Sequence, residues 1–193
     1  MNTQPARLAL LASGNGTNAE AIMQYFQHHP DIQVAMVLTN NPDAFVLQRA
    51  RKFNVPARVF TREQFRGADV LGWLRDENIT HLVLAGFLWL VPTALINAFP
   101  DRILNIHPAL LPRHGGKGMY GDRVHEAVKT AGDKETGITI HLVNEHFDEG
   151  RIIFQDSCPV YPNDTPQTIA GKVHQLEYKH FAPVIERWVH GER

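Results

Sequence analysis

The chain is poor in cysteine, in net charge and in long apolar runs, and each shortage excludes a class of protein. Its single cysteine, Cys158, cannot form an internal disulfide, which is typical of a reducing compartment. A formal net charge of -1 over 193 residues provides no basic surface for nucleic acid. Apolar stretches such as residues 82–91 are too short to span a bilayer, and residues 1–7 lack the features of a secretory signal. We therefore expect a cytoplasmic protein with no nucleic-acid or membrane partner.

The first half of the sequence alternates apolar runs with helix-like segments. The expected first helix carries its apolar side chains on one face, at Ala19, Ile22, Met23 and Phe26. Further helices are predicted over residues 44–53 and 64–77, and strands over 8–12, 32–38, 55–60 and 81–85. Such alternation predicts a parallel sheet with helices on both faces. The expected fold is a single α/β domain over residues 1–193, doubly wound and Rossmann-like, with a mostly parallel sheet.

The C-terminal part has a different pattern. Two strand candidates, residues 137–143 and 151–160, are joined by a polar segment. A final helix is predicted to start at Thr165, a good N-cap residue, with Pro166 in its first turn. Its apolar side chains keep roughly helical spacing and are expected to pack on the sheet; they are Ile169, Val173, Leu176, Phe181, Ile185 and Trp188.

An amide and an imidazole lie two residues apart in the segment 105–112, which reads Asn-Ile-His-Pro-Ala-Leu-Leu-Pro. In an extended strand Asn105 and His107 project to the same side, because strand side chains alternate. Pro108 cannot continue the hydrogen-bond ladder, so the strand should end there. Such a pair suits the stabilisation and protonation of a developing oxyanion, although a lone histidine beside a turn is more often structural.

A run of small residues, Ser-Gly-Asn-Gly-Thr-Asn at 13–18, follows the first predicted strand. Backbone amides in such a loop, together with a helix N-terminus, favour an anion, and the phosphate of a small substrate fits best. Gly14, Gly16 and Ala19 also match the dinucleotide pattern G-x-G-x-x-A. That pattern requires an acidic residue about 20 positions on, where this chain has Thr39-Asn40-Asn41. A simple tight turn is the other alternative.

A carboxylate, Asp148, follows the predicted strand 137–143 in a loop, with Gly150 expected to permit a tight bend. Beside His107 it would favour the imidazolium and raise the imidazole pKa. Taken alone, it is an ordinary solvated loop acid. His107, His141 and Asp148 could also form a metal site with two histidines and one carboxylate. No HxxxH or HxH spacing supports that arrangement, and no metal is expected.

Together these motifs resemble the phosphoribosylglycinamide formyltransferases, a group within the folate-dependent formyltransferase family. The resemblance runs from Arg7 to about His190, in the order of the family's motifs. The segments around His107 and Asp148 also occur, in related form, in other folate-dependent formyltransferases and hydrolases, whereas the loop 13–18 points to the ribonucleotide enzymes. Methionyl-tRNA formyltransferase and formyltetrahydrofolate deformylase carry additional domains, which 193 residues do not accommodate.

The resemblance implies a reaction and a set of site residues. A formyl group would pass from 10-formyltetrahydrofolate, as co-substrate, to the amine of glycinamide ribonucleotide in purine biosynthesis. Catalysis would rest on Asn105, His107 and Asp148, without a metal. The ribonucleotide phosphate would meet Gly16, Thr17 and Asn18, and the glycinamide end would meet Glu177. The folate pocket would be lined by Arg62, Leu88, Trp89, Leu90, Val91 and Asn105.

Two departures from the family pattern and two rival functions accompany this expectation. Trp89 stands where many relatives carry a basic residue, and the segment 113–123, rich in glycine, differs from the commoner family form. The rival functions are hydrolysis of the formyl folate, as in a deformylase, and binding of a phosphorylated metabolite without turnover. The sequence does not distinguish a monomer from a homodimer.

Overall fold

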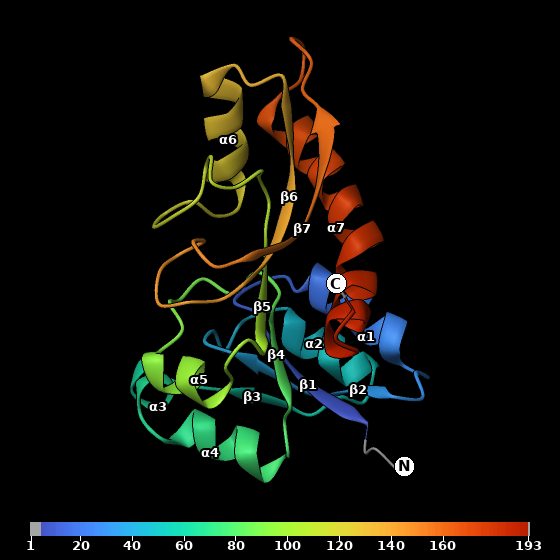
Figure 1. Ribbon diagram of the computed structural model, residues 1–193, viewed down its shortest axis with the longest axis vertical. Coiled ribbons are helices and arrows are strands. Elements are labelled where there is room, and N and C mark those ends of the chain that lie inside the picture. Colours follow the sequence, from blue (N-terminus) through green and yellow to red (C-terminus); the bar gives the residue numbers. More distant parts are fainter. Residues whose placement is uncertain (1–4, 193) are drawn as a thin grey trace.

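A seven-stranded sheet organises residues 5–192, which are the residues that the computed structural model describes (Figure 1). The first four residues of the N-terminal segment considered above, and Arg193, lie outside them. The strand order is β3-β2-β1-β4-β5-β6-β7. The strands are β1 (Ala6–Leu11), β2 (Ile32–Thr39), β3 (Ala57–Val59), β4 (His81–Leu84), β5 (Ile103–His107), β6 (Glu135–Leu142) and β7 (Ile152–Pro159). Pairing is parallel from β3 to β5 and antiparallel for β5–β6 and β6–β7, which confirms the mostly parallel sheet.

Helices cover both faces of this sheet, as expected. They are α1 (Thr17–Phe26), α2 (Val46–Lys52), α3 (Arg62–Arg66), α4 (Asp69–Asp76), α5 (Thr93–Ala98), α6 (Asp122–Ala131) and α7 (Pro166–Val189). One buried cluster joins α1, α2, α6 and α7 to one face, and a second joins α3, α4 and α5 to the other. Neighbouring residues of β1 illustrate the division, because Leu8 and Leu10 belong to the first cluster while Ala9 and Leu11 belong to the second.

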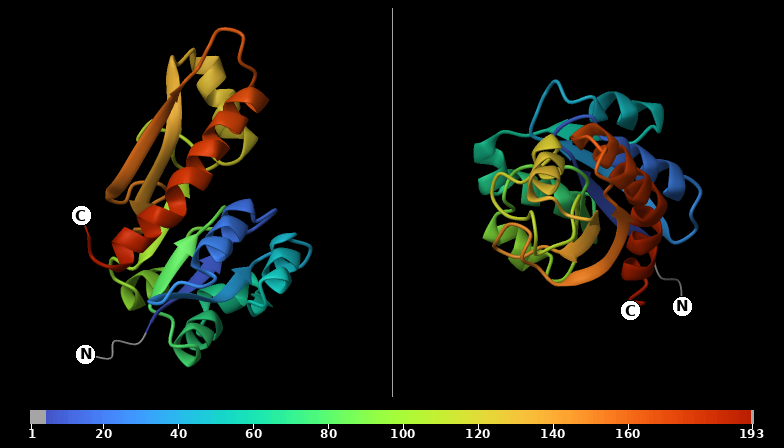
Figure 2. Two further views of the ribbon diagram at one scale, coloured as in Figure 1. Left: turned by 90° about the vertical axis from the view of Figure 1, so that its right-hand side faces the viewer. Right: turned by 90° about the horizontal axis from the view of Figure 1, so that it is seen from above.

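Local sequence signals explain where the longest helix begins. The Thr165 side chain accepts a hydrogen bond from the Thr168 amide, and the Thr168 side chain accepts one from the Thr165 amide. Pro166 occupies the first turn, where its missing N–H is not needed. From this start α7 runs along both the parallel strands and the β6–β7 hairpin (Figures 1 and 2).

Some predicted elements are wrong in detail. The single helix predicted over residues 64–77 is two helices, α3 and α4, separated at Gly67, which has an extended backbone. The side chains of Thr61 and Gln64 cap the start of α3 reciprocally, so that helix begins earlier than predicted. The strand predicted over 55–60 shortens to β3, and α5 was not predicted. Among residues 5–192, no helix is both long and apolar enough to cross a membrane.

The parallel strands bring three chain segments to one edge of the sheet. Residues that follow β1, β4 and β5, including Gly14, Gly86 and Pro108, line a single cavity there. In an open α/β sheet this edge, at the carboxyl ends of the strands, is where ligands bind.

Candidate active site

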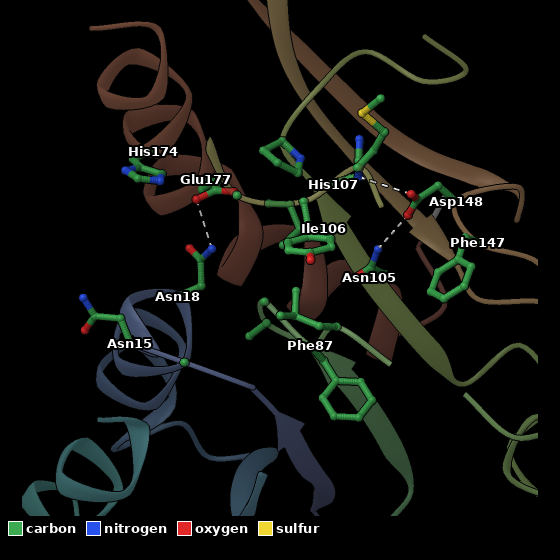
Figure 3. Close-up of a pocket in the computed structure, with 18 of the residues that line it drawn as sticks. Asn15, Asn18, Phe87, Asn105, Ile106, His107, Phe147, Asp148, His174 and Glu177 are labelled. Carbon is green, nitrogen blue, oxygen red and sulfur yellow. Dashed lines mark hydrogen bonds and ion pairs between the residues drawn. The ribbon is translucent and has the colours of Figure 1, made fainter. Parts of the chain in front are cut away.

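The cavity at the carboxyl ends of β1, β4 and β5 has a volume of about 500 Å³. Figure 3 shows side chains that line it. The loop after β1, the start of the segment after β5, the segment 116–121 and α7 form its walls. It is lined by all of the predicted catalytic and ribonucleotide-binding residues, namely Gly16, Thr17, Asn18, Asn105, His107, Asp148 and Glu177. Residues far apart in the sequence thus face one space.

Asn105 and His107 enter the cavity from the end of β5. Both side chains line it, as expected from their period-two spacing, and β5 ends at His107, directly before Pro108. The His107 side chain is only 4% exposed. Because the ring is held between the sheet and the segment that follows it, its two nitrogens have fixed neighbours.

Asp148 lies against both imidazoles of the site. Its Oδ2 is 3.5 Å from Nδ1 of His107, and its Oδ1 is 3.5 Å from Nε2 of His141. The Asn105 amide, Nδ2, also points at Oδ1 from 3.5 Å. Asp148 therefore lies close to His107, as predicted. Its Oδ2 faces His107, and its Oδ1 faces His141 and Asn105.

Gly150 lies at a bend, as expected, but not in a left-handed conformation. Its φ lies outside the left-handed region, whereas Asp148 itself has a φ of 59°. A Cβ on Gly150 would collide with the carbonyl of Leu142, so the glycine permits a close approach of the returning chain to β6.

Burial dominates the electrostatics of His107. It lowers the pKa of the imidazole below its ordinary value, although the Asp148 carboxylate and the His114 carbonyl both raise it. The contribution of the Asp148 carboxylate has the expected sign, but burial outweighs it, so the net direction in the free chain is downward.

Asp148 is held as a carboxylate. Burial raises its pKa, but the hydrogen bond from His141, the charge of His107 and the Gly116 amide together leave the pKa below its ordinary value. The site therefore contains a sheltered negative charge around which Asn105, His107 and His141 converge.

His141 is a neighbour whose role the sequence did not reveal. Its Nδ1 donates to the carbonyl of Leu142 at 2.8 Å, and its Nε2 lies 3.0 Å from Nδ2 of Asn105. This contact orients the Asn105 amide. The pairing of His141 with Asn105 across the β5–β6 ladder follows from an antiparallel register that spacing alone does not give.

The loop between β1 and α1 has the backbone expected for close approach of a ligand. Gly16 has a φ of 74°, and a Cβ there would lie 2.5 Å from Cβ of Val46 in α2. Only glycine fits both conditions. The loop leads directly into α1, whose N-terminus carries a partial positive charge.

Asn18 and Glu177 meet across the cavity wall. Nδ2 of Asn18 donates to Oε2 of Glu177 at 3.0 Å, while Oδ1 of Asn18 is buried and has no hydrogen-bond partner among the described residues. Glu177 is itself buried, and burial raises the pKa of its carboxyl. A donor on a ligand would satisfy the oxygen that the chain leaves unpaired.

The residues at the end of β2 support the loop between β1 and α1. They are amides rather than the acid that would bind the ribose of a dinucleotide. Ser13 Oγ donates to Oδ1 of Asn40 at 2.7 Å, and Nδ2 of Asn41 lies 3.4 Å from the carbonyl of Ser13. These amides occupy the place where a ribose-binding acid would stand in a dinucleotide site.

A second cavity of about 450 Å³ adjoins the first. It is lined by all of the predicted folate residues except Asn105, which lines the first cavity. The guanidinium of Arg62 lies 4.6 Å from the centre of the Trp89 ring, a cation–π contact. Leu88, Lys117 and Phe147 line both cavities. Trp89 thus provides an aromatic platform for Arg62.

Further lining residues were not predicted as site residues. Lys117, Tyr120, His125 and His174 face the first cavity. His125 is buried, its Nδ1 has no hydrogen-bond partner, and burial lowers its pKa to about 4. The sequence signal that could have identified His125 is its position on the buried face of α6.

Within residues 5–192 no three His, Cys, Asp or Glu side chains are arranged to hold a metal ion.

Comparison with known proteins agrees with this geometry. Residues 6–185 match the formyl transferase family. A phosphoribosylglycinamide formyltransferase of Bacillus subtilis is 33% identical, over 94% of this chain and 93% of that protein. The chloroplastic phosphoribosylglycinamide formyltransferase of Arabidopsis thaliana is 40% identical over 93% of this chain, which spans only 64% of that longer protein. The phosphoribosylglycinamide formyltransferase structure from Bacillus halodurans is 34% identical with a TM-score of 0.85, and the match covers 94% of each chain. The expected fold is confirmed, and the chain belongs to the formyl transferase family, in the group of the phosphoribosylglycinamide formyltransferases.

Proposed function

We propose that this chain, as a single domain, transfers a formyl group from 10-formyltetrahydrofolate to the amine of glycinamide ribonucleotide. The proposal rests on one observation, which is that two features line the same cavity. The glycine loop at 14–18 offers a phosphate site, and Asn105, His107 and Asp148 offer acid–base and oxyanion chemistry. A hydrolase acting on the folate alone would have no use for the first feature.

The ribonucleotide would be oriented by the loop and α7. Gly16, Thr17 and the start of α1 would hold the phosphate, and Asn18 and Glu177 would meet the ribose–glycinamide part. This arrangement would direct the terminal amine toward His107 and Asp148.

The folate would enter through the second cavity. Apolar walls at Leu88, Trp89 and Val91 suit a flat ring system, and Arg62 suits a carboxylate of the tail. Because Leu88 and Phe147 line both cavities, a formyl group held at their junction would lie near Asn105 and His107.

The chemistry requires a positive charge and a hydrogen-bond donor beside the formyl oxygen. As the amine attacks the formyl carbon, the oxygen gains negative charge, which Asn105 Nδ2 would stabilise by a hydrogen bond and a protonated His107 by its positive charge. Asp148 would favour the protonated imidazole. The attacking nitrogen then loses a proton and the departing folate nitrogen gains one, with a water near Asp148 as relay. Loss of one such oxyanion donor typically costs about 100- to 1000-fold in rate.

The test is formation of the deformylated folate with and without glycinamide ribonucleotide. Transfer requires both substrates and yields the formylated ribonucleotide. Release of formate from the folate alone would instead support hydrolysis, and binding without either product would support a non-catalytic module. Overnight treatment with EDTA is expected to leave transfer unchanged. The single cysteine supports a reducing compartment, such as the cytoplasm, for this reaction.

A further inference from the structure

The backbone of residues 113–116 contacts both members of the His107–Asp148 pair. The carbonyl of His114 accepts a hydrogen bond from Nε2 of His107 at 2.8 Å. The amide of Gly116 donates to Oδ2 of Asp148 at 2.9 Å. The same Oδ2 is the oxygen that lies near His107. This short stretch of backbone therefore sets the position of both the imidazole ring and the carboxylate.

Side chains anchor this stretch at the end of α6. Nε2 of His114 lies 2.7 Å from Oδ2 of Asp133, and Nη1 of Arg113 lies 3.2 Å from Oδ1. Asp133 follows Gly132, the left-handed residue that ends α6. The His114 and Asp133 side chains are each 15% exposed, whereas that of Arg113 is 52% exposed. The His114 contact is thus sheltered, and the Arg113 contact is screened by solvent.

The backbone at this point needs such an anchor. His114 has a φ of 54°, a conformation that costs a residue with a Cβ about 1–2 kcal/mol. Gly115 packs directly against Leu111, whose side chain a Cβ would strike. The carbonyl of His114 therefore points at His107 only while the chain keeps this unusual path.

We propose that His114 and Asp133 are positioning residues for the transfer reaction, because their side-chain pair fixes the carbonyl that holds Nε2 of His107. This inference rests on the proposed function. Neither residue is among those lining the cavity. With Nε2 committed to the carbonyl, the ring turns Nδ1 toward Asp148, as Figure 3 shows for the His107–Asp148 contact. Both ring nitrogens then face acceptors, an arrangement that suits the protonated imidazole.

The anchor has a definite consequence for His107. Burial lowers the pKa of the imidazole most, and the charges of His141 and His114 lower it further, whereas the Asp148 carboxylate and the His114 carbonyl raise it. When the contact between His114 and Asp133 is broken, the His114 carbonyl no longer offsets the effect of burial, and the pKa of His107 falls. A smaller fraction of His107 is then protonated near neutral pH, so kcat falls and its alkaline limb moves to lower pH.

The test begins with His114→Ala and Asp133→Ala. Each is expected to lower kcat about 10- to 100-fold, the scale of a small misplacement at a reacting centre, with little change in either KM. The pKa of His107, followed by NMR in the ligand-free protein, should fall in Asp133→Ala, which keeps the His114 imidazole. The fall should be smaller in His114→Ala, because that variant also removes the charge of His114, which lowers the same pKa. The double variant should lose no more than either single one, since both break one contact. His114→Gln, which can still donate to Asp133, should recover most of the loss.

A second histidine–aspartate pair supplies the control. His180 in α7 lies 2.7 Å from Asp156 in β7, and neither lines the cavity. His180→Ala should leave the pH profile and the His107 pKa unchanged, even if the melting temperature falls. The proposal is overturned if His114→Ala lowers only the melting temperature, or if His180→Ala moves the profile equally. Absence of transfer in the wild type would contradict the proposed function instead, and the NMR titration would still decide the anchor.

Discussion

At the scale of single residues, His107 combines near-complete burial with contacts at both ring nitrogens. His107→Ala should lower kcat about 100- to 1000-fold, the range for loss of one group that stabilises the oxyanion. Ribonucleotide affinity measured by calorimetry should stay close to that of the wild type, because the phosphate loop is untouched. His28→Ala, at an exposed position, serves as control. A variant that retains most of the wild-type kcat would refute the role of His107.

Asp148 allows a test of charge at constant shape. Asp148→Asn keeps an oxygen to accept from the Gly116 amide but removes the charge beside His107. Because that charge raises the pKa of His107 against burial, the pKa should fall further. The protonated form is then lost at lower pH, so activity should decline at a lower pH than in the wild type. An NMR titration in which His107 ignores the substitution would contradict this pairing.

At the scale of elements, the turn between β1 and α1 depends on Gly16. Gly16→Val would impose a side chain on a left-handed residue and drive it into Val46. A displacement costing about 1–2 kcal/mol should weaken ribonucleotide binding about tenfold or more, while folate binding changes little. Calorimetry with each ligand measures the two effects. Gly14→Ala, whose Cβ would meet no atom within 4 Å, should lose much less. Equal loss of both ligands would indicate global damage.

The start of α7 is a separate test of stability. Thr165→Ala removes the side-chain half of a reciprocal cap and should cost about 1 kcal/mol of unfolding free energy. Glu177 lies well inside α7, away from this cap, so the KM values for the ribonucleotide and for the folate should not change. Thr130→Ala, on the exposed side of α6, should cost nothing, because alanine is the better helix former. Urea unfolding of the two variants compares them directly; equal midpoints would show that the cap contributes little.

Elements and short motifs were predictable because their causes are local. The end of β5 at Pro108, the buried face of α1 and the cap of α7 all follow from neighbouring residues. The division of the predicted helix at Gly67 was missed because a lone glycine has no fixed meaning within a helical pattern. The contact of His141 with Asn105 depends on strand register, and that of His114 with His107 depends on a left-handed residue, which no local pattern encodes.

At the scale of the whole molecule, buried histidines should make the fold sensitive to acid. Burial lowers the pKa of both His81 and His125 from 6.5 to about 4. Between these values the unfolded chain binds protons that the folded chain does not, so stability is present above pH 6.5 and lost as pH falls toward 4. The loss can reach about 1.4 kcal/mol per pH unit for each group. Denaturant unfolding from pH 7 to pH 4 should show this slope, and His81→Phe should make it shallower. An unchanged slope would contradict the assignment.

The wall shared by the two cavities has a consequence for how the ligands affect one another. Leu88, Lys117 and Phe147 face both spaces, so whatever fills one cavity alters the surface that the other presents. The affinity of the second ligand then differs from its affinity for the empty chain by some factor. Thermodynamic linkage requires the first ligand to be tightened or loosened by the same factor. The order of addition can therefore change the route to the ternary complex. The coupling free energy between the two ligands is the same for either order, because it arises from the wall that they share.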